Sequence, residues 1–147
     1  MIKVFRKLVK KKKSPDSSVK KRVVGFYEDV LVNGLLIRAK IDTGASRSSI
    51  DSGLADFLGL GPVLGSKAVI SSHGRGIRPI VKAHVVIAGK KLNASFNMAS
   101  RHNLRYPLLI GKNILRKGFI IDSAKRLKKQ KQKIIKNTRD LHYIEET

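Results

Sequence analysis

A dense β-forming segment divided by a hairpin dipeptide is the feature that most constrains the fold. Apolar and mostly β-branched residues dominate positions 23–41, and Asn33-Gly34 interrupts them. Asn-Gly suits a two-residue turn with positive φ, so the segment predicts a β-hairpin. In the second strand Arg38 and Lys40 alternate with apolar residues, as a half-buried strand requires. That strand leads directly to Asp42.

The rest of the central region also favours strands, with room for little helix. Glycine-containing turns separate the apolar segments, and no internal repeat is visible. A short helix capped by Ser52 is expected before Gly59, and one or two helical turns fit at 112–117. The pattern predicts an all-β domain with one or two short helices. The expected later strands cover 67–72, 77–87, 92–98, 107–110 and 119–121.

The charge is concentrated at the two ends of the chain. The formal net charge is +22 over 147 residues, and +14 of it lies in residues 1–22 and 123–147. A chain of this length fits one domain. We therefore expect a basic N-terminal tail and linker at 1–22, a folded domain at 23–123, and a basic C-terminal tail at 124–147 that could form a helix. Such a charge favours a polyanionic partner.

Composition excludes several classes of site. The chain has no cysteine, which rules out disulfides, cysteine-ligated zinc and a thiol nucleophile. No apolar run approaches the roughly 20 residues of a membrane helix. We expect a cytoplasmic protein without integral membrane association.

The candidate chemistry lies in Asp42-Thr43-Gly44-Ala45, directly after an apolar strand. Glycine allows the backbone to turn sharply and present the carboxylate. Alone, the motif also fits a turn that caps its own backbone. Further along, Leu108-Leu109-Ile110-Gly111 precedes Lys112-Asn113-Ile114-Leu115. Together these two elements, with a glycine-rich hairpin between them, resemble the retropepsin family of aspartic peptidases.

The resemblance implies a small acid-protease barrel and assigns residue roles. Asp42 would be the catalytic carboxylate, Thr43 would brace two loops through its hydroxyl, and Gly44 and Ala45 would be close-packing positions. At the tip of the substrate-covering flap, His73 could bind substrate or be a solvated turn residue. The implied flap consists of Ser71, Ser72, His73, Gly74, Arg75 and Gly76.

More narrowly, residues 23–123 resemble a prokaryotic retropepsin-like branch often labelled ATP-dependent zinc protease. The sequence has no His-Glu-x-x-His motif and no glycine-rich phosphate loop ending in Lys-Ser or Lys-Thr. We therefore expect neither zinc nor ATP, and no other cofactor.

One Asp-Thr-Gly per chain implies an oligomer. Peptide hydrolysis of this type needs two carboxylates that share a proton. Asp122 also follows an apolar strand, but it lacks the following Thr-Gly. The expected enzyme is an aspartic endopeptidase, active as a homodimer with Asp42 from each subunit.

An alternative function is a non-catalytic protein of the same fold, bound to ribosomal or other RNA through its basic tails. A third possibility is an acidic, polyglutamate-type substrate, because relatives of the resembled branch are associated with ATP-grasp glutamate ligases. The candidate nucleic-acid-binding residues are Lys10, Lys11, Lys12, Lys13, Lys20, Lys21, Arg22, Lys125, Arg126, Lys128, Lys129, Lys131 and Lys133.

Overall fold

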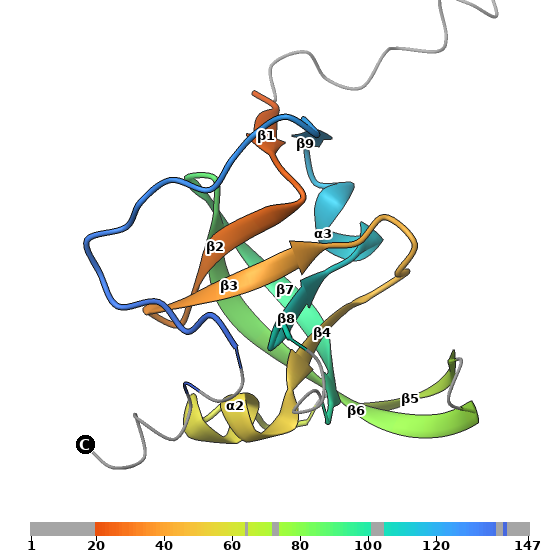
Figure 1. Cartoon of the computed structure of the whole chain (residues 1–147). Coiled ribbons are helices and arrows are strands. Elements are labelled where there is room, and N and C mark those ends of the chain that lie inside the picture. Colours follow the sequence, from red (N-terminus) through yellow and green to blue (C-terminus); the bar gives the residue numbers. More distant parts are fainter. Residues whose placement is uncertain (1–19, 64, 72–73, 101–104, 138–139, 141–147) are drawn as a thin grey trace, which may run out of the picture.

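A computed structural model describes residues 20–63, 65–71, 74–100, 105–137 and 140 of the chain. Strands dominate this part, with two short helices among them (Figure 1), which confirms the all-β prediction. Neither helix is long and apolar enough to cross a membrane. The elements are β1 (Arg22–Val24), β2 (Tyr27–Val32), β3 (Leu35–Ile41), β4 (Ser48–Asp51), α2 (Ser52–Phe57), β5 (Gly65–Ser71), β6 (Gly74–Ile87), β7 (Lys90–Ala99), β8 (Leu108–Ile110), α3 (Lys112–Leu115) and β9 (Phe119–Ile121).

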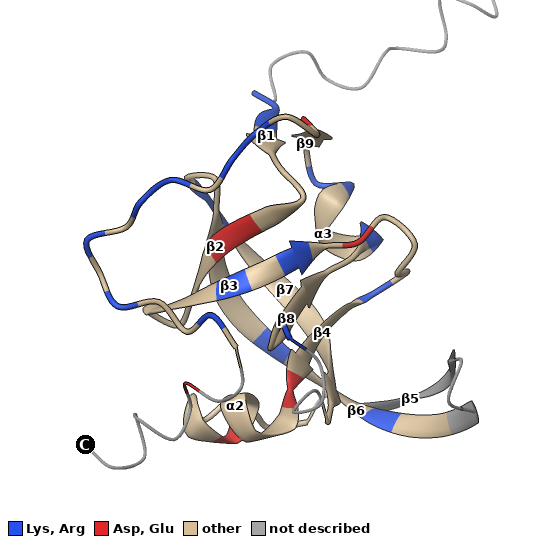
Figure 2. Cartoon of the chain, in the orientation of Figure 1, with Lys and Arg blue, Asp and Glu red and all other residues tan. Residues whose placement is uncertain are grey.

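The expected hairpin at Asn33-Gly34 joins β2 to β3. Asn33 has a φ of 47° and Gly34 a φ of 86°, the positive values that a two-residue turn of this kind requires. β2 and β3 pair antiparallel along their length. The basic residues of β3 alternate with buried apolar ones (Figure 2). The period-two pattern therefore sets which face of β3 enters the core.

Six strands close into a barrel in the order β2-β3-β8-β4-β7-β6, and β6 pairs with β2 to complete it. β3 and β8 run parallel, with Ala39 opposite Leu108 and Ile41 opposite Ile110. β1 and β9 form a separate two-stranded parallel sheet. The parallel pairing of β3 with β8 carries the end of each strand to the same edge of the barrel.

The longest strand, β6, belongs to two structures. Its second half lies in the barrel between β2 and β7, whereas its first half pairs with β5 from Gly65↔Ile80 to Ser71↔Gly74. The β5–β6 hairpin therefore projects beyond the barrel, as the green ribbons in Figure 1 show.

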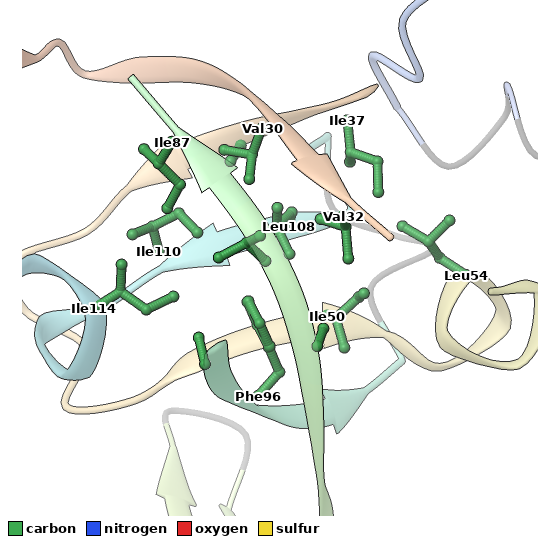
Figure 3. Packing of buried hydrophobic residues seen from close by; sticks show 14 of the residues in the cluster. Val30, Val32, Ile37, Ile50, Leu54, Ile87, Phe96, Leu108, Ile110 and Ile114 are labelled. Atoms are coloured by element: carbon green, nitrogen blue, oxygen red, sulfur yellow. The ribbon is translucent and has the colours of Figure 1, made fainter. Parts of the chain in front are cut away.

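The core fills the barrel with aliphatic side chains around one aromatic ring. Phe96 of β7 is fully buried in one cluster with branched residues from the other five barrel strands, and the helices contribute Leu54 and Ile114 (Figure 3). Burying an aliphatic side chain of this size contributes about 1.5–3 kcal/mol. In a chain without disulfides, this packing holds the barrel together.

The helix after β4 begins differently from the expectation. Asp51, not Ser52, is the N-cap, because its carboxylate accepts a hydrogen bond from the Leu54 amide at 3.1 Å. Within the helix Leu54 is fully buried, whereas Phe57 is 44% exposed. Asp51 is the better cap because it ends β4 with its side chain already buried against the first turn.

The C-terminal segment, residues 124–137, forms no helix. It follows an extended course back to the barrel, and we call it the strap (Figure 1). Ile135 bridges to Ile37, its amide donates to the Leu36 carbonyl at 2.9 Å, and its carbonyl accepts from the Arg38 amide at 2.8 Å. The physical reason is that three-residue β8 pairs only with the end of β3, so the earlier edge of β3 needs another partner.

The strap is therefore attached to the folded domain at both of its ends. Ile135 is 2% exposed and belongs to the core. At the other end the Lys125 ammonium contacts the Glu28 carboxylate at 2.7 Å and donates to the Val23 carbonyl at 2.8 Å. A boundary at residue 123 thus separates the barrel from a segment that packs into it.

Candidate active site

The Asp42 loop begins where β3 ends. The Asp42 amide donates to the Ile110 carbonyl at 2.8 Å, so the β3–β8 pairing extends to this residue. Asp42 is half-buried, and Thr43 and Gly44 are exposed. The loop therefore presents its carboxylate at the surface of the barrel from a rigid base.

Hydrogen bonds within the loop orient the carboxylate. The Gly44 amide donates to Asp42 Oδ1 at 2.9 Å, and the Ala45 amide approaches the Asp42 carbonyl at 3.4 Å. A Cβ on Gly44 would lie 3.2 Å from that same Oδ1. Glycine at this position therefore lets the backbone amide reach the carboxylate, which keeps one oxygen directed into the loop.

The turn after β8 supports the loop from behind. The Lys112 amide donates to the Ala45 carbonyl at 2.8 Å, and the Asn113 amide donates to the Ser46 carbonyl at 3.2 Å. A Cβ on Gly111 would lie 2.8 Å from the Ala45 carbonyl oxygen. Two loops that are distant in sequence thus pack backbone against backbone, and this contact explains why the apolar strand ends in glycine.

Asn113 joins the elements beneath this contact. Its Oδ1 accepts from both the amide and the hydroxyl of Ser48 at 2.8 Å, and its Nδ2 donates to the Ser95 carbonyl at 2.9 Å. The Ser48 hydroxyl oxygen accepts in turn from the Gly111 amide at 2.9 Å. Sequence reasoning missed this role. The available signal was a lone amide residue inside an apolar stretch.

The flap assignment falls on the β5–β6 hairpin. Ser71 ends β5 and Gly74 begins β6, so Arg75 and Gly76 lie in the strand and not in the expected turn. Ser72 and His73 lie outside the described residues. Ile77, three residues into the hairpin from Gly74, is 76% exposed.

Asp122, the other acidic residue considered, takes a different local structure. It follows β9, and its Oδ1 accepts from the Ala124 amide at 2.9 Å. It is exposed, and no glycine follows to turn the chain as Gly44 does.

Three cavities in the described part of the chain lie away from the Asp42 loop. They have volumes of about 420, 330 and 290 Å³, and none of these three is lined by Asp42. Within the described residues no group of three histidine or acidic side chains could hold a metal ion.

A tyrosine pair lies near the base of β8. The rings of Tyr27 and Tyr106 stack with centroids 5.0 Å apart. Burial raises the pKa of Tyr106 above 10.0, and the Tyr27 hydroxyl raises it further, while the Arg105 guanidinium opposes the shift.

The candidate nucleic-acid-binding residues fall into two described groups. Lys20 and Lys21 are exposed beside β1, with Arg22 half-buried. The strap carries the second group, on which Arg126, Lys128, Lys129, Lys131 and Lys133 are exposed and Lys125 is half-buried. Lys10, Lys11, Lys12 and Lys13 lie outside the described residues.

Comparison with known proteins places the fold. No family model matches the chain, and no curated protein matches it. Among solved structures, a protein of unknown function (DUF785) from Legionella pneumophila is similar with a TM-score of 0.52 and 20% identity, covering 72% of this chain and 96% of its own. EIAV protease, solved with an inhibitor, is similar with a TM-score of 0.53 and 16% identity, covering 70% of this chain and 92% of its own.

The similarity at these identities concerns the backbone. EIAV protease, a chain of different sequence, shares the overall fold over 70% of this chain. The protein therefore has the retropepsin fold.

Proposed function

We propose that the protein is an aspartic endopeptidase that acts as a homodimer, with one Asp42 from each subunit in its catalytic dyad. The observation that carries the proposal is the Asp42 carboxylate on an exposed loop, with Oδ1 held by the Gly44 amide. The fold, shared with EIAV protease, supports it. The narrower resemblance to the prokaryotic retropepsin-like branch remains part of this proposal.

The exposed position of the loop suits an active site to which each subunit contributes one of two carboxylates. A single carboxylate on an open surface can neither share a proton nor exclude water from a substrate. A two-fold axis beside Thr43 and Gly44 would bring two identical loops together. The Thr43 hydroxyls would then brace the loops, and Ala45 would sit at the close contact with the turn after β8.

The chemistry in such a dyad is acid–base catalysis. One carboxylate takes a proton from water, whose oxygen attacks the scissile carbonyl carbon, while the protonated partner donates a hydrogen bond to the carbonyl oxygen. The C–N bond then breaks as the amide nitrogen takes up a proton. The β5–β6 hairpins would cover the peptide and exclude solvent.

The test is cleavage of a diverse peptide library by the full chain, read by mass spectrometry, together with sedimentation of the same preparation. We expect cleavage by the wild type, none by Asp42→Asn, and a dimer at the concentrations where cleavage occurs. Unchanged cleavage by pure Asp42→Asn would exclude the catalytic assignment. A strict monomer at high concentration would exclude the dyad.

A further inference from the structure

The strap is the most strongly charged described segment, and its charge is all of one sign. Residues 125–137 contain seven basic residues and no acidic one. Arg126, Lys128, Lys129 and Lys131 are exposed. Figure 2 shows the basic positions as blue stretches along the strap. The carboxylates of the strand below are already paired, Glu28 with Lys125 at 2.7 Å and Asp29 with Arg38 at 3.0 Å. The exposed cations of the strap are therefore not neutralised by β2.

The anchors at the two ends set where these cations lie. Lys125 is held by Glu28 and by the Val23 carbonyl, and Ile135 is held by β3. Gly25 permits the first contact, because a Cβ there would lie 2.6 Å from the Lys125 carbonyl oxygen. Between the anchors an open cavity of about 330 Å³ lies between the strap and the barrel. A loop fixed at both ends loses less conformational entropy on binding than a free tail.

We propose that the strap, held between Lys125 and Ile135, is a binding site for the sugar-phosphate backbone of single-stranded RNA. The site lies apart from the Asp42 loop and goes beyond the proposed peptidase activity. Cations contribute affinity by releasing counterions from phosphates. Gln130 and Gln132 alternate with the lysines and are exposed.

The glutamines favour RNA over an acidic peptide. A glutamine amide can donate to a phosphate oxygen and accept from a ribose 2′-hydroxyl, whereas a polyglutamate chain offers acceptors only in its side chains. The strap has no aromatic residue on which a base could stack. Binding should therefore be independent of base sequence.

The experiment compares two triple variants of the full chain that remove the same charge from different places. The first is Lys128→Ala/Lys129→Ala/Lys131→Ala on the strap, and the matched control is Lys82→Ala/Lys91→Ala/Arg116→Ala, at three exposed positions outside the strap. Fluorescence anisotropy with a short unstructured RNA, repeated over a salt series, gives affinity and salt dependence. We expect the strap variant to bind RNA at least about tenfold more weakly than the wild type. The plot of the logarithm of its association constant against the logarithm of salt concentration should be less steep by about 2. Equal losses in both variants would overturn the proposal.

A third variant tests whether the anchored position of the strap matters for RNA binding independently of its charge. Ile135→Ala removes the anchor without altering any charge, so we expect severalfold weaker RNA binding by protein that circular dichroism shows to be folded. Unchanged affinity would overturn the role of the anchor. The lysine variants change exposed side chains only, so their test stands even if Ile135→Ala unfolds the barrel. DNA of the same sequence and polyglutamate complete the series, and binding of either as tight as that of RNA would overturn the RNA assignment.

Discussion

Asn113 Oδ1 accepts two hydrogen bonds from Ser48, one from its amide and one from its hydroxyl, both at 2.8 Å. The two residues are separated by 65 positions in sequence. Through this pair, the turn after β8 is fixed to the start of β4, and the Asp42 loop lies between the two elements. The geometry of the candidate active site therefore depends on a polar contact outside it.

Asn113→Ala should lower the free energy of unfolding by about 2–3 kcal/mol, because it leaves buried donors of Ser48 without an acceptor. Urea denaturation followed by circular dichroism measures the change. The matched control is Asn93→Ala, the same chemical change at an exposed position of β7. A difference below about 0.5 kcal/mol between the two variants would contradict the role given to Asn113.

Gly111→Ala should destabilise the protein by about 1–3 kcal/mol, since the new methyl group would meet backbone atoms of Ala45 and Arg47 at 2.8–2.9 Å. Backbone cannot move aside as a flexible side chain would, so the Asp42 loop must shift and peptide cleavage should fall with stability. Gly65→Ala serves as the control, because a Cβ there meets nothing within 4 Å. Equal thermal stability of the two variants would argue against the close contact.

Mixing wild-type protein with an equal amount of Asp42→Asn should reduce peptide cleavage to about a quarter of the activity of undiluted wild-type dimers at the same total concentration. The reason is that only dimers with two Asp42 carboxylates would be active. Asp122→Asn is the matched control, and a mixture with it should retain full activity. A fall to one half with Asp42→Asn would show that each chain works independently.

Removal of the strap should destabilise the barrel. Truncation after residue 123 deletes Ile135, whose loss from the core alone should cost about 2–5 kcal/mol. Truncation after residue 137 keeps this contact and is the control. Chemical denaturation of the two forms gives the difference, and equal midpoints would show that the strap contributes nothing to folding stability.

Tyr106 should ionise at higher pH than an exposed tyrosine, chiefly because burial disfavours its charged form. Tyr27→Phe should lower its pKa, and Arg105→Gln should raise it. Because the folded-state pKa is the higher one, the contribution of Tyr106 to stability is complete below the unfolded value and is lost as pH rises through the folded pKa. Phenolate absorbance during an alkaline titration follows the ionisation, and identical titrations of all three proteins would refute the coupling.

Local sequence signals predicted the elements that local physics determines. Asn33-Gly34 formed the expected turn because few residues besides this pair accept positive φ at both positions. Asp42 was selected as the candidate carboxylate because a strand leads into it and Gly44 follows it. The apolar residues before Gly111 predicted a buried strand, since alternation is lost where both faces are covered.

The missed features depend on contacts between distant residues. Nothing near Asn113 in sequence shows that Ser48 will face it. The strap looked like a basic tail because its apolar residues are few, yet Ile135 alone is enough to fill the place beside β3 that short β8 leaves open. The helix N-cap was predicted at Ser52, one residue after the observed cap at Asp51, because β4 ends directly where the helix begins.

The parallel pairing of β3 with β8 also has a consequence for synthesis on the ribosome. Residues 39–41 can pair with β8 only after residues 108–110 have been synthesised. The Asp42 loop likewise gains its supporting contacts only after Gly111 and Lys112 have been added. Non-local pairing of this kind slows folding. A nascent chain that has emerged only as far as β6 thus carries Asp42 without the support that shapes its loop. We expect the Asp42 loop to take its final shape only after residues 108–112 have left the ribosome.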